Sequence, residues 1–243
     1  NYYLNYVKRL NKLAGNQIAL WQNKKLIKLI NHAYENTEYY RKLFDDNNIS
    51  PESIQGIKDL KRIPSLTKNQ IINNFESLIP KNIKNIRHIN ASTGGSTGDP
   101  LKYLLDINTW SFHAANTISN WSRAGYRYGD KYLALGSSNL FSGKSPSLRN
   151  KIYYLLKGKM SRDGISMSDD VCQIYIRTIN EQNIKFVYGY ASSIYLLADY
   201  AIKNKINLKL RACFPTSEIL TPIYREKIEE AFNCEVLNSY GAM

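Results

Sequence analysis

The first part of the chain, residues 1 to about 80, carries apolar side chains at helical spacing and has no convincing strand pattern. One apolar stripe there consists of Trp21, Leu26, Ile27 and Ile30. Thr67 followed by Gln70 matches the capping box that starts a helix. The pattern therefore predicts a helical region over residues 1–83.

From about residue 84 onward, short apolar runs alternate with segments of helical periodicity. Strands are expected at 86–91, 101–105, 131–136, 185–188, 210–214 and 235–237. Apolar positions recur at helical spacing within 171–179 and 194–202, and Thr221 with Pro222 supplies an N-cap and a first-turn proline for a further helix. Strands separated by helices predict an α/β core over residues 84–243, with a mostly parallel sheet flanked by helices.

The composition is that of a soluble protein, with 243 residues, 43% hydrophobic residues and a mean hydropathy of −0.42. No run approaches the roughly 20 apolar residues that a membrane-spanning helix needs, and no signal peptide opens the chain. Cys172, Cys213 and Cys234 are scattered without a metal-ligand spacing. We therefore expect a protein of the reducing cytoplasm without a protein-bound metal.

The net charge of +13 raises the question of nucleic-acid binding, because basic patches attract phosphate backbones. The lysines are spread along the chain, and the densest run, Lys24, Lys25 and Lys28, fits a solvated helix face. The 19 tyrosines are not interleaved with basic residues in an RNA-binding motif. The charge instead favours small anionic ligands, and nucleic-acid binding stays as the weaker alternative.

Candidate chemistry is concentrated in a loop between two expected strands. The loop reads Ser92-Thr93-Gly94-Gly95-Ser96-Thr97-Gly98-Asp99-Pro100. Backbone N–H groups freed by the glycines, together with the hydroxyls, form a cradle for phosphate oxygens. The alternative is an ordinary glycine- and serine-rich hairpin turn, which uses the same residues.

Two common nucleotide-binding loops are excluded at this position. A P-loop needs Gly-Lys-Ser/Thr at the start of a helix, whereas Asp99-Pro100 stands there and an expected strand follows. A dinucleotide-binding fingerprint also needs a helix directly after its glycines. The phosphate cradle, if present, is of another kind.

The loop resembles the Ser/Thr-rich loop of adenylate-forming enzymes, with Asp99 in place of the usual lysine. Other segments are similar, in the same order, to the phenylacetate-CoA ligase family and its capsular-polysaccharide, CapK-type branch. These segments are residues 36–44 with 60–68, 121–130, 187–193, and the pair 215–222 and 238–241. The resemblance implies the large N-terminal domain of an adenylate-forming enzyme, in partial form.

The resemblance also implies roles for particular residues, which follow expected strand ends as ligand-binding residues of α/β sheets do. By this resemblance, phosphate is bound by Ser92, Thr93, Gly94, Gly95, Ser96, Thr97 and Gly98. Adenine and ribose are bound by Ser217, Glu218, Tyr240 and Gly241. The acyl pocket is formed by Tyr188, Gly189, Tyr190 and Ser192. No catalytic residue is assigned.

Each of these residues also has a purely structural interpretation. Tyr240 fits a buried aromatic of the core, and Glu218 fits a charge placed near a helix N-terminus. Tyr188 and Tyr190 fit a strand-to-helix turn that Ser192 or Ser193 caps. Their joint occurrence in the family's order favours the functional interpretation.

The implied activity is the activation of a carboxylic acid by ATP and Mg²⁺ as an acyl-adenylate, with transfer to CoA or to another thiol or amine. In the CapK-type branch this activity would serve surface-polysaccharide assembly. The chain stops at Met243, before the family's later Mg²⁺ and ribose ligands and its small C-terminal domain. We therefore expect an incomplete, inactive fragment, or else a binding protein without catalysis; the acid and the oligomeric state are not assigned.

Overall fold

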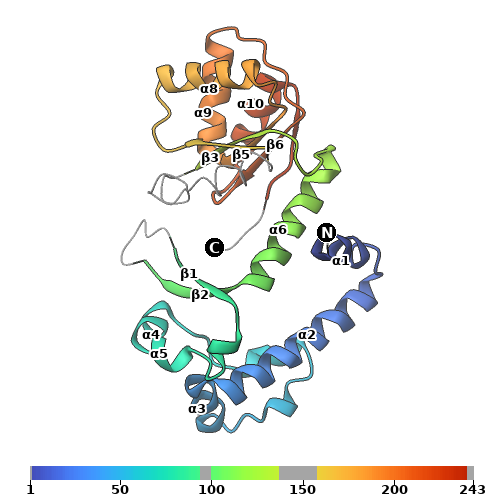
Figure 1. Ribbon diagram of the computed structural model, residues 1–243, viewed down its shortest axis with the longest axis vertical. Helices are drawn as coiled ribbons and strands as arrows, with labels where there is room; N and C mark the ends of the chain where they lie inside the picture. The colour runs from blue at the N-terminus through green and yellow to red at the C-terminus, as the bar shows by residue number, and fades with distance from the viewer. Residues whose placement is uncertain (1, 94–99, 137–157, 240–243) are drawn as a thin grey trace. The chain divides into compact units, whose positions relative to one another are not determined.

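The computed structural model describes residues 2–93, 100–136 and 158–239. The chain divides into two compact units, Asn1–Ala115 and Asn116–Met243 (Figure 1). Residues 94–98 of the predicted phosphate loop, together with Tyr240 and Gly241, lie outside the described residues.

The first unit is mainly helical, and the strands β1 and β2 precede the start of α6 at its end. Its core contains Ile30, Phe44, Ile49 and Ile54. The elements in chain order are α1 (Tyr2–Leu10), α2 (Gly15–Asn36), α3 (Glu38–Asp46), the 3-10 helices η1 (Pro51–Ser53) and η2 (Ile57–Arg62), α4 (Lys68–Asn73), α5 (Phe75–Leu78), the 3-10 helix η3 (Ile83–Asn85), β1 (His88–Ser92), β2 (Lys102–Asp106) and the start of α6 (Ile107–Trp121).

Local hydrogen bonds explain where these helices begin. The predicted capping box is present at α4, because the Thr67 hydroxyl accepts from the Gln70 N–H at 3.3 Å and the Thr67 N–H donates to Gln70 Oε1 at 2.8 Å. Thr37 separates α2 from α3, and its buried hydroxyl donates to the Ala33 carbonyl at 2.8 Å while it accepts from the Tyr40 N–H. Side-chain hydroxyls therefore set both boundaries.

The second unit is a five-stranded, all-parallel sheet in the order β4-β3-β5-β6-β7. This confirms the predicted α/β class with a parallel sheet. Its elements are the end of α6, the 3-10 helix η4 (Ser122–Ala124), β3 (Tyr132–Gly136), β4 (Lys159–Asp163), α8 (Asp169–Glu181), β5 (Phe186–Tyr190), α9 (Ala191–Lys203), β6 (Ala212–Thr216), α10 (Pro222–Phe232) and β7 (Glu235–Val236).

All six predicted strands are present, with ends displaced by one or two residues. The strand β4, however, was not predicted from the sequence. Its residues, Lys159-Met160-Ser161-Arg162-Asp163, include one apolar side chain and no β-branched residue. Among the described strands, β4 pairs with β3 alone and lies at the edge of the sheet, where polar side chains are common.

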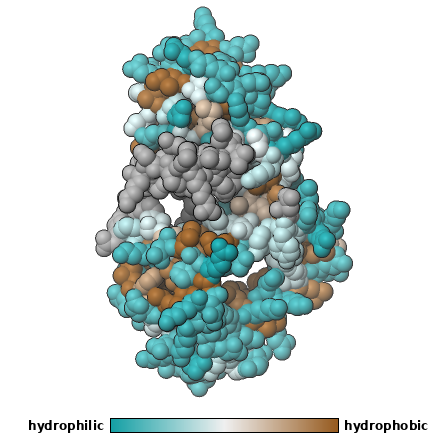
Figure 2. Space-filling view, in the orientation of Figure 1, coloured by the Kyte–Doolittle hydropathy of each residue, from teal (hydrophilic) through white to brown (hydrophobic). Residues whose placement is uncertain are grey.

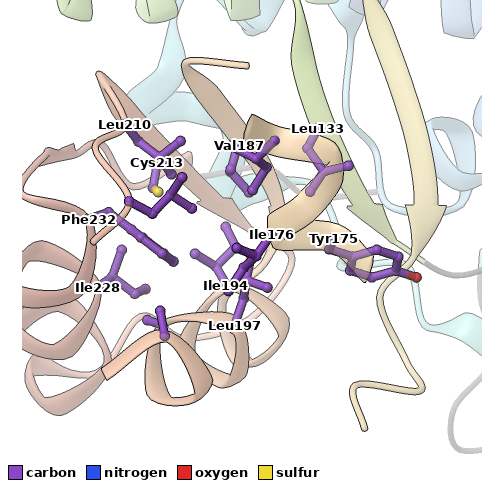
Figure 3. Close-up of a cluster of buried hydrophobic side chains, with 14 of the residues drawn as sticks. Leu133, Tyr175, Ile176, Val187, Ile194, Leu197, Leu210, Cys213, Ile228 and Phe232 are labelled. Carbon is purple, nitrogen blue, oxygen red and sulfur yellow. The ribbon is translucent and has the colours of Figure 1, made fainter. Parts of the chain in front are cut away.

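Alternate residues of the central strands supply the two faces of the sheet. One face packs against α8, α9 and α10, and the other packs against the end of α6. Figure 3 shows the first of these layers, in which Leu133, Val187 and Cys213 from three strands meet the helical side chains Ile194, Leu197, Ile228 and Phe232. The helical stripes predicted for α9 and α10 are therefore their core-facing sides. On α8 the prediction is only partly correct, because the apolar position Ile174 is 55% exposed, whereas Cys172 and Ile176 are buried.

The opposite face of the sheet carries an aromatic cluster. Trp121, from the end of α6, stacks on Phe214 of β6 with ring centroids 4.6 Å apart and an interplanar angle of 5°. The Tyr126 ring meets the Trp121 ring edge-to-face, with centroids 5.1 Å apart. The Tyr188 ring of β5 is also 5.1 Å from the Trp121 ring, centroid to centroid. Such contacts add to the free energy gained from burying the rings.

The surface is mostly hydrophilic on the face seen in Figure 2. The densest lysine run, Lys24, Lys25 and Lys28, is exposed on α2 as expected. Among the described helices, none combines the length and the apolar character that crossing a membrane requires.

Candidate functional site

The carboxyl ends of β5, β6 and β7 form one edge of the sheet in the second unit. Tyr190, the last residue of β5, pairs with Thr216, the last residue of β6. Thr216 in turn forms a parallel bridge with Ser239, whose N–H donates to the Pro215 carbonyl at 2.8 Å. Three segments that are distant in sequence therefore reach the same edge, as expected for a parallel sheet.

Glu218 joins two of the predicted groups of site residues. Its Oε2 accepts a hydrogen bond from the Ser192 backbone N–H at 2.8 Å. Ser192 lies in the first turn of α9, where the helix dipole and unpaired N–H groups favour negative charge. The structural interpretation of Glu218 is thus correct, and the same contact brings the predicted ribose or adenine residue against the predicted acyl pocket.

Ser217 adopts an unusual backbone conformation directly before Glu218. Its φ is +65°, in the left-handed region that residues other than glycine, asparagine and aspartate rarely adopt. This residue ends the extended path of β6 at Thr216 and lies directly before the carboxylate that reaches α9. Such conformations carry a cost and occur often at functional sites.

Gly189 lies where β5 passes close to β3. A Cβ at this position would come within 2.2 Å of the Leu135 carbonyl oxygen and 2.8 Å of Leu135 Cβ. Only glycine therefore fits without moving a neighbouring strand. This steric requirement is independent of the predicted contact of Gly189 with an acyl group.

Tyr188 is directed into the aromatic cluster. Burial raises the pKa of its phenol above the ordinary value, and a hydrogen bond with the Thr216 side chain opposes part of this rise. The Thr216 hydroxyl also donates to the Ser239 carbonyl at 3.3 Å. Tyr188 is therefore a neutral phenol at physiological pH and is connected through Thr216 to the third segment of the edge.

The prediction that Ser192 or Ser193 caps α9 is wrong. The N-cap residue is Tyr190, and no side chain provides a cap hydrogen bond there. The buried Ser193 hydroxyl instead donates to the Gly164 carbonyl and so fixes α9 to the segment that follows β4. The sequence gives no sign that Gly164 is the partner of Ser193, because Gly164 follows β4, the strand that was not predicted.

The predicted phosphate loop begins in the first unit, at the end of the β1–β2 hairpin. Ser92 pairs with Lys102, as the last pair of this antiparallel ladder. Thr93 closes the loop, because its N–H donates to the Leu101 carbonyl at 3.0 Å and its hydroxyl oxygen accepts from the Leu101 N–H at 3.0 Å. The two flanking strands are confirmed, and the hydrogen of the Thr93 hydroxyl is not used in these bonds.

Within residues 2–93, 100–136 and 158–239, no three side chains of the His, Cys, Asp and Glu types come together as a metal site would require. The carboxylate of Glu218 is the acidic group at the β5–β6–β7 edge that interacts with another predicted site residue.

No protein-family model matches the chain. Individual relatives do match: the chain is 27% identical to Protein CapK of Staphylococcus aureus over 99% of its own length and 53% of that protein. It is also 27% identical to a phenylacetate-coenzyme A ligase of Pseudomonas putida, over 87% of this chain and 48% of the relative. The chain spans about half the length of these curated relatives.

Two solved structures of 2-hydroxyisobutyryl-CoA ligase superpose on most of the chain. A complex with 2-HIB-AMP and CoA in the thioesterification state gives a TM-score of 0.71 at 18% identity, over 95% of this chain and 50% of the ligase. The chain has the fold of the adenylate-forming CoA ligases. An open conformation of the same ligase, with the same ligands, gives a TM-score of 0.68 over 91% of this chain and 49% of the ligase. The adenylate-forming fold and the similarity to CapK and the phenylacetate-CoA ligases, both expected from the motifs, are confirmed.

Proposed function

We propose that the protein carrying this chain activates a carboxylic acid with ATP as an acyl-adenylate and transfers the acyl group to the thiol of CoA. The contact between Glu218 and Ser192 is the observation that carries this proposal. In an acyl-adenylate the acyl group is bonded directly to the phosphate of AMP, so nucleotide and acyl pockets must adjoin. A contact between residues of the two predicted pockets supports that arrangement.

In this proposal, the adenosine half is held at the β5–β6–β7 edge by Ser217 and Glu218 together with Tyr240 and Gly241. The Glu218 carboxylate is an acceptor for hydroxyl or amino hydrogens and is exposed. The acyl group lies against Tyr188, Gly189, Tyr190 and Ser192. The neutral Tyr188 phenol and the aromatic rings behind it make this side of the pocket largely apolar.

The triphosphate is assigned to Ser92, Thr93, Gly94, Gly95, Ser96, Thr97 and Gly98. Thr93 fits this role because its hydroxyl, which accepts from the Leu101 N–H, also carries a hydrogen that can be donated to a phosphate oxygen. The acid's carboxylate oxygen attacks the α-phosphorus, and pyrophosphate leaves with the electrons of the broken P–O bond. Hydrogen-bond donors lower the barrier by positioning the groups and neutralising charge, to which Mg²⁺ would contribute when bound.

The place of this reaction in the cell is proposed from the similarity to CapK across nearly the whole chain. We propose a cytoplasmic enzyme whose activated acyl group serves surface-polysaccharide assembly. A binding protein of the same fold, without catalysis, is the competing function, since the chain covers about half of its relatives.

Carboxylate-dependent exchange of labelled pyrophosphate into ATP tests the proposal. The complete gene product is assayed with pooled aryl, fatty, amino and hydroxy acids, and thioester formation is then followed with CoA. Exchange with one pool, lost when Thr93 and Thr97 are replaced by alanine, is the expected result. ATP binding without exchange for any pool would favour the binding protein.

Glu218→Gln separates the two roles of this residue. Glutamine keeps an acceptor oxygen for the Ser192 N–H but removes the charge, so the fold is preserved while nucleotide affinity falls. Glu226→Gln, an exposed carboxylate on α10, is the matched control and is expected to leave the exchange rate unchanged. Equal rates of pyrophosphate exchange in the two variants would show that Glu218 is not part of the nucleotide site.

A further inference from the structure

Two of the three cysteines, scattered in the sequence, meet in the second unit. Cys213 lies in β6, and Cys234 lies between α10 and β7. Their Sγ atoms are 3.7 Å apart. The third cysteine, Cys172, lies on α8, where its thiol approaches the Met167 carbonyl.

The two thiols of the pair have different surroundings. Cys213 is fully buried in the layer between the sheet and the helices, whereas Cys234 is partly exposed (Figure 3 shows Cys213). Burial and the neighbouring Cys234 raise the pKa of the Cys213 thiol well above its ordinary value. A small oxidant would therefore reach Cys234 first, with Cys213 already within contact distance.

We propose that Cys213 and Cys234 are an oxidisable pair that forms a reversible disulfide when the protein meets hydrogen peroxide. No metal and no proposed substrate takes part, so the inference is independent of the proposed adenylation. It assigns a modification site to a pair of side chains that the candidate functional site does not use.

The reaction balances in two steps. The Cys234 thiolate attacks one peroxide oxygen, the O–O bond breaks, and the hydroxide that leaves takes up the thiol's proton to become water. The sulfur of Cys213 then attacks the resulting Cys234 sulfenic acid; its S–O bond breaks, and the departing oxygen leaves as water with the Cys213 proton. The two thiols lose two electrons in total, and one peroxide gains them.

The local fold permits the sulfurs to approach. They must move from 3.7 Å to about 2.05 Å apart. Cys213 is held in the middle of the sheet, paired on both sides through β5 and β7. Cys234 lies outside any helix or strand, directly after Asn233 in the left-handed conformation, so it is the residue that moves.

A disulfide here would tie the edge strand β7 to β6. The register places Val236 opposite Cys213, and the isolated bridge between Thr216 and Ser239 follows, beyond the end of β7. The cross-link closes a loop that contains α10, and such a closure reduces the freedom of the unfolded chain. The oxidised protein is therefore expected to melt at a higher temperature than the reduced one.

Thiol counting with mass spectrometry tests the pair directly. The reduced protein is treated with a small excess of hydrogen peroxide, unfolded, and alkylated. We expect one alkylated cysteine in place of three, a protein lighter by two hydrogen atoms before alkylation, and full recovery after dithiothreitol. Peptide mapping of the same sample should show Cys213 linked to Cys234. Because this measurement uses the wild-type protein, it does not depend on the folding of any variant.

Variants distinguish this pair from general oxidation. Cys172→Ala should form the same disulfide and leave no thiol to alkylate. Cys213→Ala should instead leave Cys234 as a sulfenic acid that dimedone traps, with no rise in melting temperature. Three alkylated thiols after peroxide, a link that involves Cys172, or bridges only between two protein molecules would each overturn the proposal.

Discussion

Gly189 and Glu218 illustrate what single residues contribute to the β5–β6–β7 edge. Gly189 allows β5 to lie against the Leu135 backbone of β3, because any side chain would overlap with it. Glu218 crosses from the end of β6 to the first turn of α9. Both residues stand out in the sequence by family resemblance. The sequence also indicates a helix N-terminus as the partner of Glu218, but it gives no sign of the steric requirement at Gly189.

Gly189→Ala is expected to destabilise the protein by about 1–3 kcal/mol, the usual cost of overpacking a core. The added Cβ would lie within 2.2 Å of the Leu135 carbonyl oxygen, which is part of the sheet and cannot turn away. Urea denaturation followed by circular dichroism measures the change. Gly15→Ala is the control, since nothing lies within 4 Å of the position that its added methyl group would take, and it should be neutral or slightly stabilising.

At the scale of elements, a hydroxyl in or next to the first turn of a helix can have either of two roles. It can cap its own helix, or it can bond to a distant segment of the chain. Thr221 caps α10 by accepting from the Tyr224 N–H at 3.2 Å, and Pro222 occupies the first turn, both as predicted. Ser193 lies in the first turn of α9 but bonds to Gly164 instead. Sequence alone could not distinguish these cases, since both serine and threonine suit either role.

Thr221→Ala should cost about 1 kcal/mol of unfolding free energy, because the Tyr224 N–H loses its acceptor. Thermal and urea unfolding give the value. Ser168→Ala at the N-cap of α8 is the matched control, because the Ser168 side chain makes no cap hydrogen bond. Equal losses in the two variants would show that the hydroxyl contact at α10 contributes nothing.

The helices α9 and α10 are joined by a charge cluster that predicts a pH dependence. Asp199 accepts from Lys203 at 2.7 Å and from Lys227 at 2.5 Å, and these contacts lower the pKa of its carboxyl below the ordinary 3.8. A lowered pKa means that the stabilisation is present at neutral pH and is lost as the pH falls through the lowered value.

Asp199→Asn should therefore be less stable than wild type at pH 7, and the difference should vanish in acid below the lowered pKa. Urea midpoints measured from pH 7 down to the acid limit of folding test this. In a Lys203→Ala, Lys227→Ala background the same substitution should change stability little at any pH. A difference that persists unchanged in acid would contradict the assignment.

At the scale of the whole molecule, the charge of +13 acts over the surface rather than at one contact. A positive potential raises the local concentration of anionic ligands and is screened by salt. This field is compatible with triphosphate binding and with weak attraction of nucleic acids. The two can be separated by measurement.

ATP affinity is expected to fall several-fold between 50 mM and 500 mM NaCl as screening increases. Calorimetric titration of the complete gene product gives the dissociation constants. Adenosine, which lacks the phosphates, is the matched ligand and should bind with nearly constant affinity. Tighter, strongly salt-dependent binding to unrelated oligonucleotides than to ATP would favour the nucleic-acid alternative.

The sequence by itself determined the class of the fold, six of the seven described strands, the core-facing stripes of α9 and α10 with part of that of α8, and the resemblance to adenylate-forming enzymes. These features are local, because periodicity, caps and short motifs depend on residues that are close together in the sequence. The tertiary structure alone decided the edge strand β4 and the contacts of Glu218 with Ser192 and of Cys213 with Cys234. Such contacts join residues more than 20 positions apart, and no local pattern records which distant segments a parallel sheet will bring together.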